Sequence, residues 1–118
     1  MGLILVRIYD SYDTAAKRAE TAAQVLKDTE MTDSFTGNEA MAVRVNYGNI
    51  LGNGDNNDAL VTVSFGPKNN IMAVYRKNGD SYEYAGTVGY FYGVDNISIE
   101  KLADRPDVII FRERNNQS

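Results

Sequence analysis

The spacing of apolar residues changes near residue 40, and this change limits the folds open to the chain. Between residues 13 and 31, apolar side chains recur every three or four positions, which is the period of an α-helix with one buried side. From Met41 onward they alternate with polar residues, which is the period of a strand with one face toward solvent. The chain has 118 residues, the length of one domain. We therefore predict a single domain over residues 1–118, with a helix at 13–31 and a β region at 41–113.

The predicted helix has a buried side rich in alanine. Ser11 or Asp13 is expected to cap its start, because short polar side chains accept hydrogen bonds from the first free N–H groups of a helix. The predicted buried stripe consists of Ala15, Ala19, Ala22 and Leu26, widened by Ala16 and Ala23. Because alanine is small, this stripe predicts a close approach of the helix to the surface on which it packs.

Turn-forming residues divide the β region into short strands. We predict strands at 41–47, 60–65, 71–76, 82–88, 97–99 and 108–112, and residues 3–9 form a further short strand or lead into the helix. Asn78-Gly79 predicts a hairpin between two of these strands. Gly86, Gly89 and Gly93 are expected at bulges or a tight bend.

These elements together predict an α+β fold. In it, the N-terminal helix packs on a five- to six-stranded, mostly antiparallel β-meander. The alternative is a small β-barrel or sandwich to which the helix is only an appendage.

The chain contains no cysteine and no histidine. This composition excludes disulfides, thiolate metal sites and every Ser–His–Asp or Cys–His catalytic arrangement. Carboxylate pairs such as Asp55/Asp58 or Glu83/Glu100 are the remaining acid–base candidates, but carboxylates at such spacings occur in any acidic protein. We therefore predict a protein that is not an enzyme, and the weakest rival is a carboxylate-based hydrolase.

The charge of the chain and its N-terminal segment bear on its partners and its location. Sixteen acidic and twelve basic residues leave a net charge of −4, and the basic residues are dispersed, so we expect no nucleic-acid partner. The run Leu3-Ile4-Leu5-Val6 is too short for a secretory signal or a membrane span, so we expect no transmembrane segment. If Met1-Gly2 is an artificial start, an export signal could precede the sequence. An extracellular or cell-envelope location is therefore left open, as is the oligomeric state.

The segment 49–58 is dense in Gly, Asn and Asp. Such residues form ordinary tight loops, and this is the first interpretation. The alternative is a calcium site, because Ca²⁺ binds oxygen ligands from Asp and Asn on loops that turn tightly. Its ligands would be Asn53, Asp55, Asn57 and Asp58.

Two segments resemble a known repeat family. Asn53-Gly54-Asp55-Asn56-Asn57-Asp58-Ala59-Leu60 with Val61-Thr62-Val63, and later Val74-Tyr75-Arg76-Lys77-Asn78-Gly79-Asp80-Ser81-Tyr82, resemble one FG-GAP/VCBS-type repeat over about residues 49–84. The resemblance implies a calcium loop, a strand and a hairpin, and a role in adhesion or recognition. Leu51 stands where the family has its opening ligand, and one copy does not close a propeller. The resemblance therefore implies a single, stand-alone repeat.

Five tyrosines fall within eighteen positions. They are Tyr75, Tyr82, Tyr84, Tyr90 and Tyr92. Tyrosine combines an apolar ring with a polar tip, so an exposed group suits contact with a protein or a glycan, whereas a buried group would stabilise the sheet. We predict a recognition module, from an exported bacterial protein, that binds a protein or glycan through this tyrosine-bearing β surface. The alternative is a small acidic inhibitor or immunity-type protein that masks a basic partner.

Overall fold

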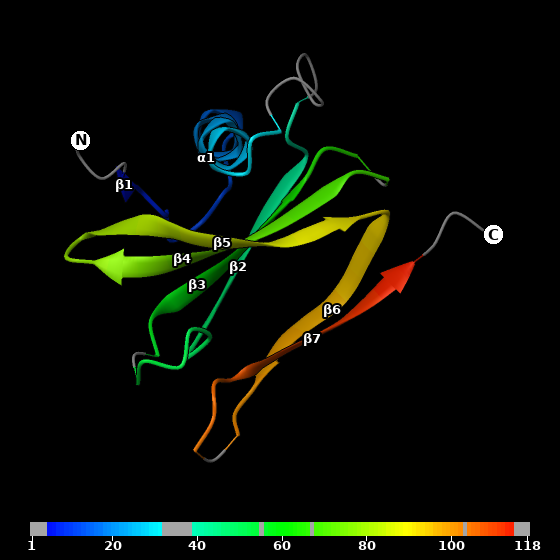
Figure 1. Cartoon of the computed structure of the whole chain (residues 1–118). Coiled ribbons are helices and arrows are strands. Elements are labelled where there is room, and N and C mark those ends of the chain that lie inside the picture. Colours follow the sequence, from blue (N-terminus) through cyan, green and yellow to red (C-terminus); the bar gives the residue numbers. More distant parts are fainter. Residues whose placement is uncertain (1–4, 32–38, 55, 67, 103, 115–118) are drawn as a thin grey trace.

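The computed structural model describes residues 5–31, 39–54, 56–66, 68–102 and 104–114. In these residues, one helix and seven strands follow each other along the chain (Figure 1). Their bounds are β1 Leu5–Val6, α1 Ala15–Asp28, β2 Ala42–Gly48, β3 Asp58–Ser64, β4 Asn70–Asn78, β5 Ser81–Phe91, β6 Gly93–Glu100 and β7 Val108–Arg114.

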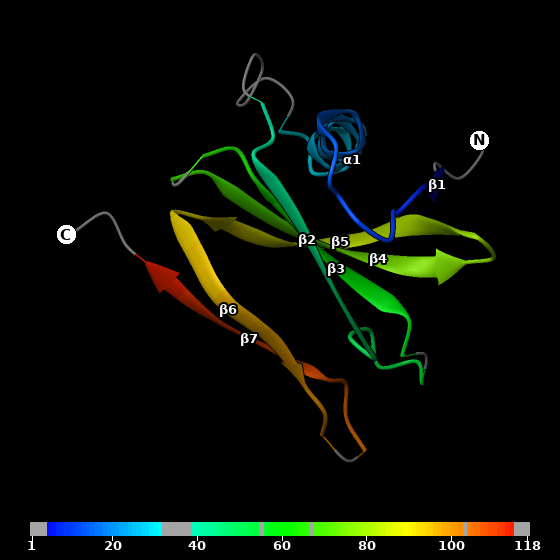
Figure 2. The ribbon, with the colours of Figure 1, turned by 180° about the vertical axis from the view of Figure 1, so that it is seen from behind.

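The strands form two antiparallel sheets. Five strands pair in the order β1-β5-β4-β3-β2, and β6 pairs only with β7. Figures 1 and 2 show α1 on one side of the five-stranded sheet and the β6–β7 hairpin on the other. The predicted α+β class with antiparallel strands is confirmed. The helix packs on an antiparallel sheet of five strands, and β2 to β5 follow one another in it as a meander. The difference from the prediction is that β6 and β7 form a separate sheet. Of the alternative fold, the barrel is contradicted, since neither sheet closes on itself in the described residues. The packing of the β6–β7 sheet on the five-stranded sheet agrees with the sandwich, but the helix belongs to the core and is not an appendage.

The five-stranded sheet is covered on both faces by apolar side chains. On the helix face, Val25 of α1 packs in one cluster with Val61 of β3. On the opposite face, Leu60 and Met72 pack in a second cluster with Val94 of β6. Each such side chain contributes about 1.5–3 kcal/mol when fully buried, so both layers stabilise the sheet.

The second cluster corrects the prediction for β3. Its sequence alternates and places Thr62 and Ser64 on the side opposite Val61 and Val63, and alternation of this kind is typical of a strand with one face toward solvent. Instead, Thr62 is fully buried and its Oγ1 has no hydrogen-bond partner in the structure. The reason is that the β6–β7 hairpin covers the face that the alternation assigns to water.

The helix is shorter than predicted and is capped by another residue. It begins after Thr14, whose Oγ1 accepts a hydrogen bond from the backbone N–H of Lys17 at 3.2 Å. Asp13, one of the two predicted caps, forms an ion pair with Lys17 at 3.3 Å instead. At the other end, the hydroxyl of Thr29 donates to the carbonyl oxygen of Val25 at 2.7 Å. The cap and the two ends of the helix therefore differ from the prediction by one to three residues.

The predicted alanine stripe is mostly wrong. Ala22 and Leu26 are buried, but Ala15, Ala16, Ala19 and Ala23 are exposed. The buried residues of α1 are Thr21, Ala22, Val25 and Leu26, and the first six residues of the helix contain none of them. Valine and leucine gain more from burial than alanine does, and the helix therefore packs through the turns that carry them.

The hairpin between β4 and β5 is confirmed, with a small change in its turn. Asn78 pairs with Ser81, so the two-residue loop is Gly79-Asp80 rather than Asn78-Gly79. Gly79 has a φ of 64°, and a positive φ at the first loop residue is what a type II′ turn requires. Register shifts beside Gly86 and Gly89 confirm the predicted bulges on β5.

Candidate functional site

The structure separates the five candidate tyrosines into two groups. Tyr75 and Tyr82 are buried in the core on the helix face, so they are withdrawn as contact residues. The Tyr75 hydroxyl donates a hydrogen bond to Oδ2 of Asp28 at 2.7 Å. Burial, followed by this hydrogen bond, raises the pKa of Tyr75 well above its ordinary value of 10. These two rings therefore stabilise the junction of sheet and helix.

Tyr84 and Tyr90 are exposed, at 37% and 45% of their surface. Tyr84 is the cross-strand partner of Tyr75, and the two rings meet edge to face with centroids 5.9 Å apart. The Tyr90 hydroxyl donates to the carbonyl oxygen of Thr29, at the end of α1, at 3.2 Å. Both rings thus lie on the helix face of β5, where Tyr84 contacts the buried ring of Tyr75 and Tyr90 is hydrogen-bonded to Thr29.

Tyr92 lies in the connection between β5 and β6. It is half-buried, and the Lys68 ammonium lies 5.9 Å from its ring centroid. Its carbonyl oxygen accepts a hydrogen bond from Nδ2 of Asn70 at 2.9 Å. Tyr92 therefore lies beyond the end of the β5 strand that carries the other two exposed rings.

The exposed tyrosines border a sheet edge. The two residues of β1 pair only with Tyr82 and Glu83. In the part of the chain that the structure describes, residues 84–91 of β5 have β4 on one side and no strand on the other. The stretch from Tyr84 to Val94 contains no Asp, Glu, Lys or Arg. This combination is unusual, since native edge strands commonly carry charges that prevent pairing with other chains.

Sequence reasoning missed one further exposed tyrosine. Tyr47 of β2 is exposed and lies in the same cross-strand row as Ala59, Tyr75 and Tyr84. Partial burial, followed by the nearby Tyr12 and Asp10, raises the pKa of Tyr47 above the ordinary value of 10. The available signal was its place in the alternating strand at 41–47. It lies at the β2 edge of the sheet, on the far side from β5.

The loop at 49–58 is organised by its own hydrogen bonds. Oδ2 of Asp58 accepts from the backbone N–H of Leu51 at 2.9 Å, and Oδ1 of Asn49 accepts from Gly54 at 3.0 Å. Asp58 is fully buried, whereas Asn53 and Asn57 are exposed. Asp55 lies outside the described residues. Among those described, no three Asp or Glu side chains gather as they would around a metal. The calcium site therefore stays a prediction.

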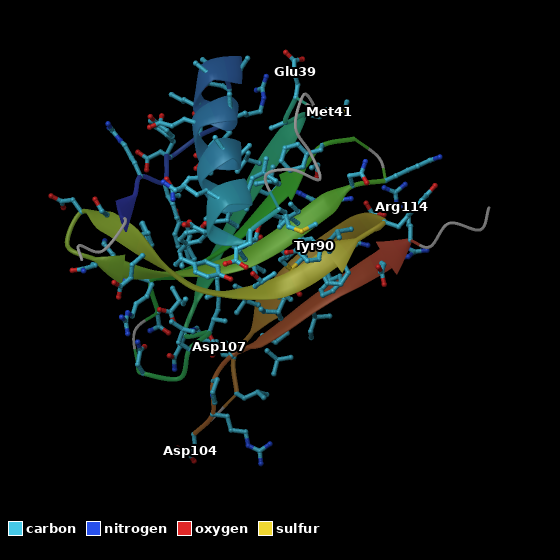
Figure 3. All side chains as sticks on the ribbon, turned by 45° about the horizontal axis from the view of Figure 1, so that its top comes forward. Glu39, Met41, Tyr90, Asp104, Asp107 and Arg114 are labelled. Atoms are coloured by element: carbon cyan, nitrogen blue, oxygen red, sulfur yellow. The ribbon has the colours of Figure 1, made fainter. Side chains whose placement is uncertain are left out.

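A second loop meets this one at the turn end of the β6–β7 hairpin. Figure 3 shows Asp104 and Asp107 there. The Asp107 N–H donates to the Asn49 carbonyl oxygen at 2.8 Å, and the Asn49 N–H donates to Oδ2 of Asp107 at 2.9 Å. Nζ of Lys101 lies 3.1 Å from the same carboxylate. The Asn49 N–H, with help from Lys101, lowers the pKa of Asp107 below its ordinary value of 3.8.

These contacts border a polar pocket of about 490 Å³ between the two loops. Its charged lining residues are Lys101, Asp104, Arg105 and Asp107. The segment between the predicted strands at 97–99 and 108–112 gave no sign in the sequence that residue 107 would meet residue 49. The buried carboxylate joins the loops and so has a structural role.

The predicted carboxylate pairs do not form a described acid–base site. Glu83 is buried on the sheet, where Nε of Arg76 donates to Oε1 of Glu83 at 2.7 Å. Glu100 lies exposed at the end of β6, in the other sheet. The pair Asp55/Asp58 involves a residue outside the described ranges. The absence of catalytic function stays a prediction.

Comparison of the chain with protein-family models, with curated proteins and with solved structures finds no match. The resemblance to an FG-GAP/VCBS-type repeat is therefore neither supported nor contradicted by these comparisons. No helix in the described residues is both long and apolar enough to cross a membrane. Among the described residues, β5 beyond Glu83 is an uncharged strand edge with no partner strand on its outer side.

Proposed function

We propose that this chain is a non-enzymatic recognition module that binds a protein partner by strand addition at the free edge of β5. The observation that carries the proposal is the uncharged edge at residues 84–91, bordered by Tyr84 and Tyr90. An extended segment of the partner would pair with this edge through backbone hydrogen bonds, and side-chain contacts would add selectivity.

The tyrosine rings suit the role of selective contacts. Tyr84 and Tyr90 each expose more than a third of their surface. The Tyr84 hydroxyl is hydrogen-bonded to Thr87 and its ring contacts the ring of Tyr75. The Tyr90 hydroxyl is hydrogen-bonded to the carbonyl oxygen of Thr29. A side chain that is already ordered loses less conformational entropy on binding, which leaves more of the contact energy as affinity. The rings would flank the added strand on the helix face.

The lack of charge also favours pairing. A charged side chain on this edge would lose hydration when a strand covers it, at a cost of several kcal/mol if it stays unpaired. The two bulges on β5 increase the local twist of the edge. The edge would therefore accept a strand of matching twist and disfavour indefinite, amyloid-like growth.

The alternative of an acidic inhibitor has less support. Its contact surface would need acidic side chains, and the exposed tyrosines lie on the stretch of the chain that has none. A glycan partner stays within the first prediction, but the row of backbone donors and acceptors on the edge favours a polypeptide.

The test uses peptides selected from a random library on the immobilised full chain. NMR shift mapping should place the bound peptides at residues 84–91, with slowed amide exchange there. Val88, 39% exposed on β5, is changed to lysine, and the matched control is Val108→Lys, 40% exposed on β7. Val88→Lys should weaken peptide binding about tenfold or more, because charge on an edge strand opposes pairing. Equal binding by the two variants, or peptides that map elsewhere, would contradict the proposal.

A further inference from the structure

A second pocket lies at the other end of the hairpin from Asp107. It has a volume of about 480 Å³ and lies between the ends of β2 and β3, the start of β4, and the β6–β7 hairpin. Figure 3 shows Met41 and Arg114 toward this end of the molecule. The side chains that matter for its chemistry are Met41, Arg44, Val94, Asp95 and Arg114.

Arg44 is a half-buried cation in this pocket. It extends from β2 on the face opposite the helix, and its Nη2 donates to the carbonyl oxygen of Val94 at 3.0 Å. Within the described ranges, no carboxylate forms an ion pair with it. A guanidinium has five N–H donors, so one carbonyl contact leaves most of them for other acceptors. Burial of a charge is costly unless it is paired, and among the described residues the one partner that the structure shows for Arg44 is the Val94 carbonyl oxygen.

Arg114 brings a second guanidinium to the same pocket. Its Nε forms an ion pair with Oδ2 of Asp95 at 2.8 Å, and its side chain is 56% exposed. The guanidinium lies across Gly93, where a Cβ would be only 3.1 Å from its Nε and Nη2. The glycine therefore allows the arginine to lie against the backbone at the pocket wall, with its terminal nitrogens still able to donate.

The local charge of the pocket is opposite to that of the protein. Two arginines and one aspartate line it, which gives +2 − 1 = +1, whereas the whole chain carries −4. Diffuse attraction therefore does not draw anions to this chain, and any anion binding has to come from a local arrangement. Planar guanidinium groups match carboxylates through paired hydrogen bonds.

We propose that this pocket binds the carboxylate of a small organic ligand, with Arg44 and Arg114 as its hydrogen-bond donors. The pocket also has an apolar wall, formed by the exposed Met41 and by Val94. A ligand that fits both parts has a short hydrocarbon chain attached to its carboxylate. This site does not depend on the proposed role of the β5 edge.

The test is an NMR titration of the full chain with hexanoate, acetate and inorganic phosphate at constant ionic strength. Hexanoate should give saturable shift changes at the amides of Arg44, Gly66 and Asp95, with a Kd on the order of 1 mM. Acetate should bind several times more weakly, because it lacks the apolar chain. Hexanoate without saturable shifts, or phosphate binding as tightly as hexanoate, would overturn the proposal.

Variants locate the effect. Arg44→Gln and Arg44→Lys should each weaken hexanoate binding about tenfold or more, the lysine because it keeps the charge but loses the planar fork. Arg114→Gln should also weaken hexanoate binding. Because the Arg114 side chain is 56% exposed, this variant should fold normally and tests the proposal even if the Arg44 variants fold poorly. Arg112→Gln, on the same strand but outside the pocket, is the matched control. Equal affinity in Arg112→Gln and Arg114→Gln would contradict the assignment.

Discussion

Removing the hydroxyl of Tyr75 should lower stability at neutral pH by an amount that disappears in alkaline solution. Tyr75→Phe keeps the buried ring and removes only the hydrogen bond to Asp28. Hydrogen bonds to charged groups contribute about 1.5–3 kcal/mol. Asp28 is half-buried and water can reach it, so we expect a loss near the lower end, about 1.5 kcal/mol. In urea this corresponds to a midpoint lowered by about 1 M with an unchanged slope.

The pH dependence follows from the raised pKa of Tyr75. Stability from a raised pKa is complete below the unfolded value, about 10, and is lost as pH rises above it, because only the unfolded phenol then releases its proton. At pH 11, one unit above the unfolded pKa, the release of one proton from the unfolded state lowers the wild type's free energy of unfolding by about 1.4 kcal/mol. The midpoints of the wild type and Tyr75→Phe should therefore meet near pH 11.

The assay is urea unfolding followed by circular dichroism between pH 7 and pH 11. Because both proteins share every other titrating group, their difference isolates Tyr75. A double-mutant cycle with Asp28→Asn should give a coupling of about 1 kcal/mol at pH 7, with the sign of a favourable contact. A difference that stays constant up to pH 11 would refute the reasoning, because it would mean that the folded protein does not protect the Tyr75 proton.

Three further predictions concern the loops and turns. Gly48→Ala should lower stability by about 1–3 kcal/mol, because its Cβ would lie 2.7 Å from Cγ2 of Ile99. The control is Gly86→Ala, whose Cβ would meet nothing within 4 Å and which should be neutral or stabilising. Thermal melts of both variants measure the difference. The stability difference between the wild type and Asp107→Asn should be complete above pH 3.8 and should shrink as pH falls below it toward the lowered pKa of Asp107; a difference that stays constant between pH 5 and pH 2 would contradict this. Calcium, compared with a chelator, should leave the melting midpoint unchanged, since no three Asp or Glu side chains gather in the described residues; a rise with calcium would instead establish the ion site.

The local elements of this fold could be predicted from the sequence because their signals are local. The helical period at 13–31 and the alternation after Met41 depend on neighbours within a few positions. The reversal at Gly79 depends on two residues of a turn, and the bulges lie beside the glycines that were expected to mark them. None of these features needed a distant part of the chain.

The covering of β3 could not be predicted in the same way. Thr62 is polar and lies in an alternating strand, so the sequence alone favours a solvent-facing position for it. In the structure, the β6–β7 hairpin covers this face of the sheet. A hint was present in β4, where residues 71–75 form an apolar run without alternation. Such a run is typical of a strand buried on both faces, and it implied a second covering layer.

The candidate site shows the same division. The sequence supplied the tyrosines and the uncharged stretch from Tyr84 to Val94. It could not distinguish Tyr75 from Tyr84, which are cross-strand partners with opposite exposure. Tyr75 lies on a central strand beneath the helix, and Tyr84 lies on a strand whose outer side has no partner beyond Glu83 in the described part of the chain.

By itself, the order of amino acids determined where the backbone coils, extends and reverses, because those choices are made by torsional preferences and by the spacing of apolar groups within a few residues. Only the tertiary structure decided which tyrosines contact water, which edge stays open and which two arginines share a pocket. The physical reason is that exposure and proximity depend on segments far apart in the chain, such as Tyr75 with Asp28 and Arg44 with Arg114, and no short window of sequence contains both partners of such a contact.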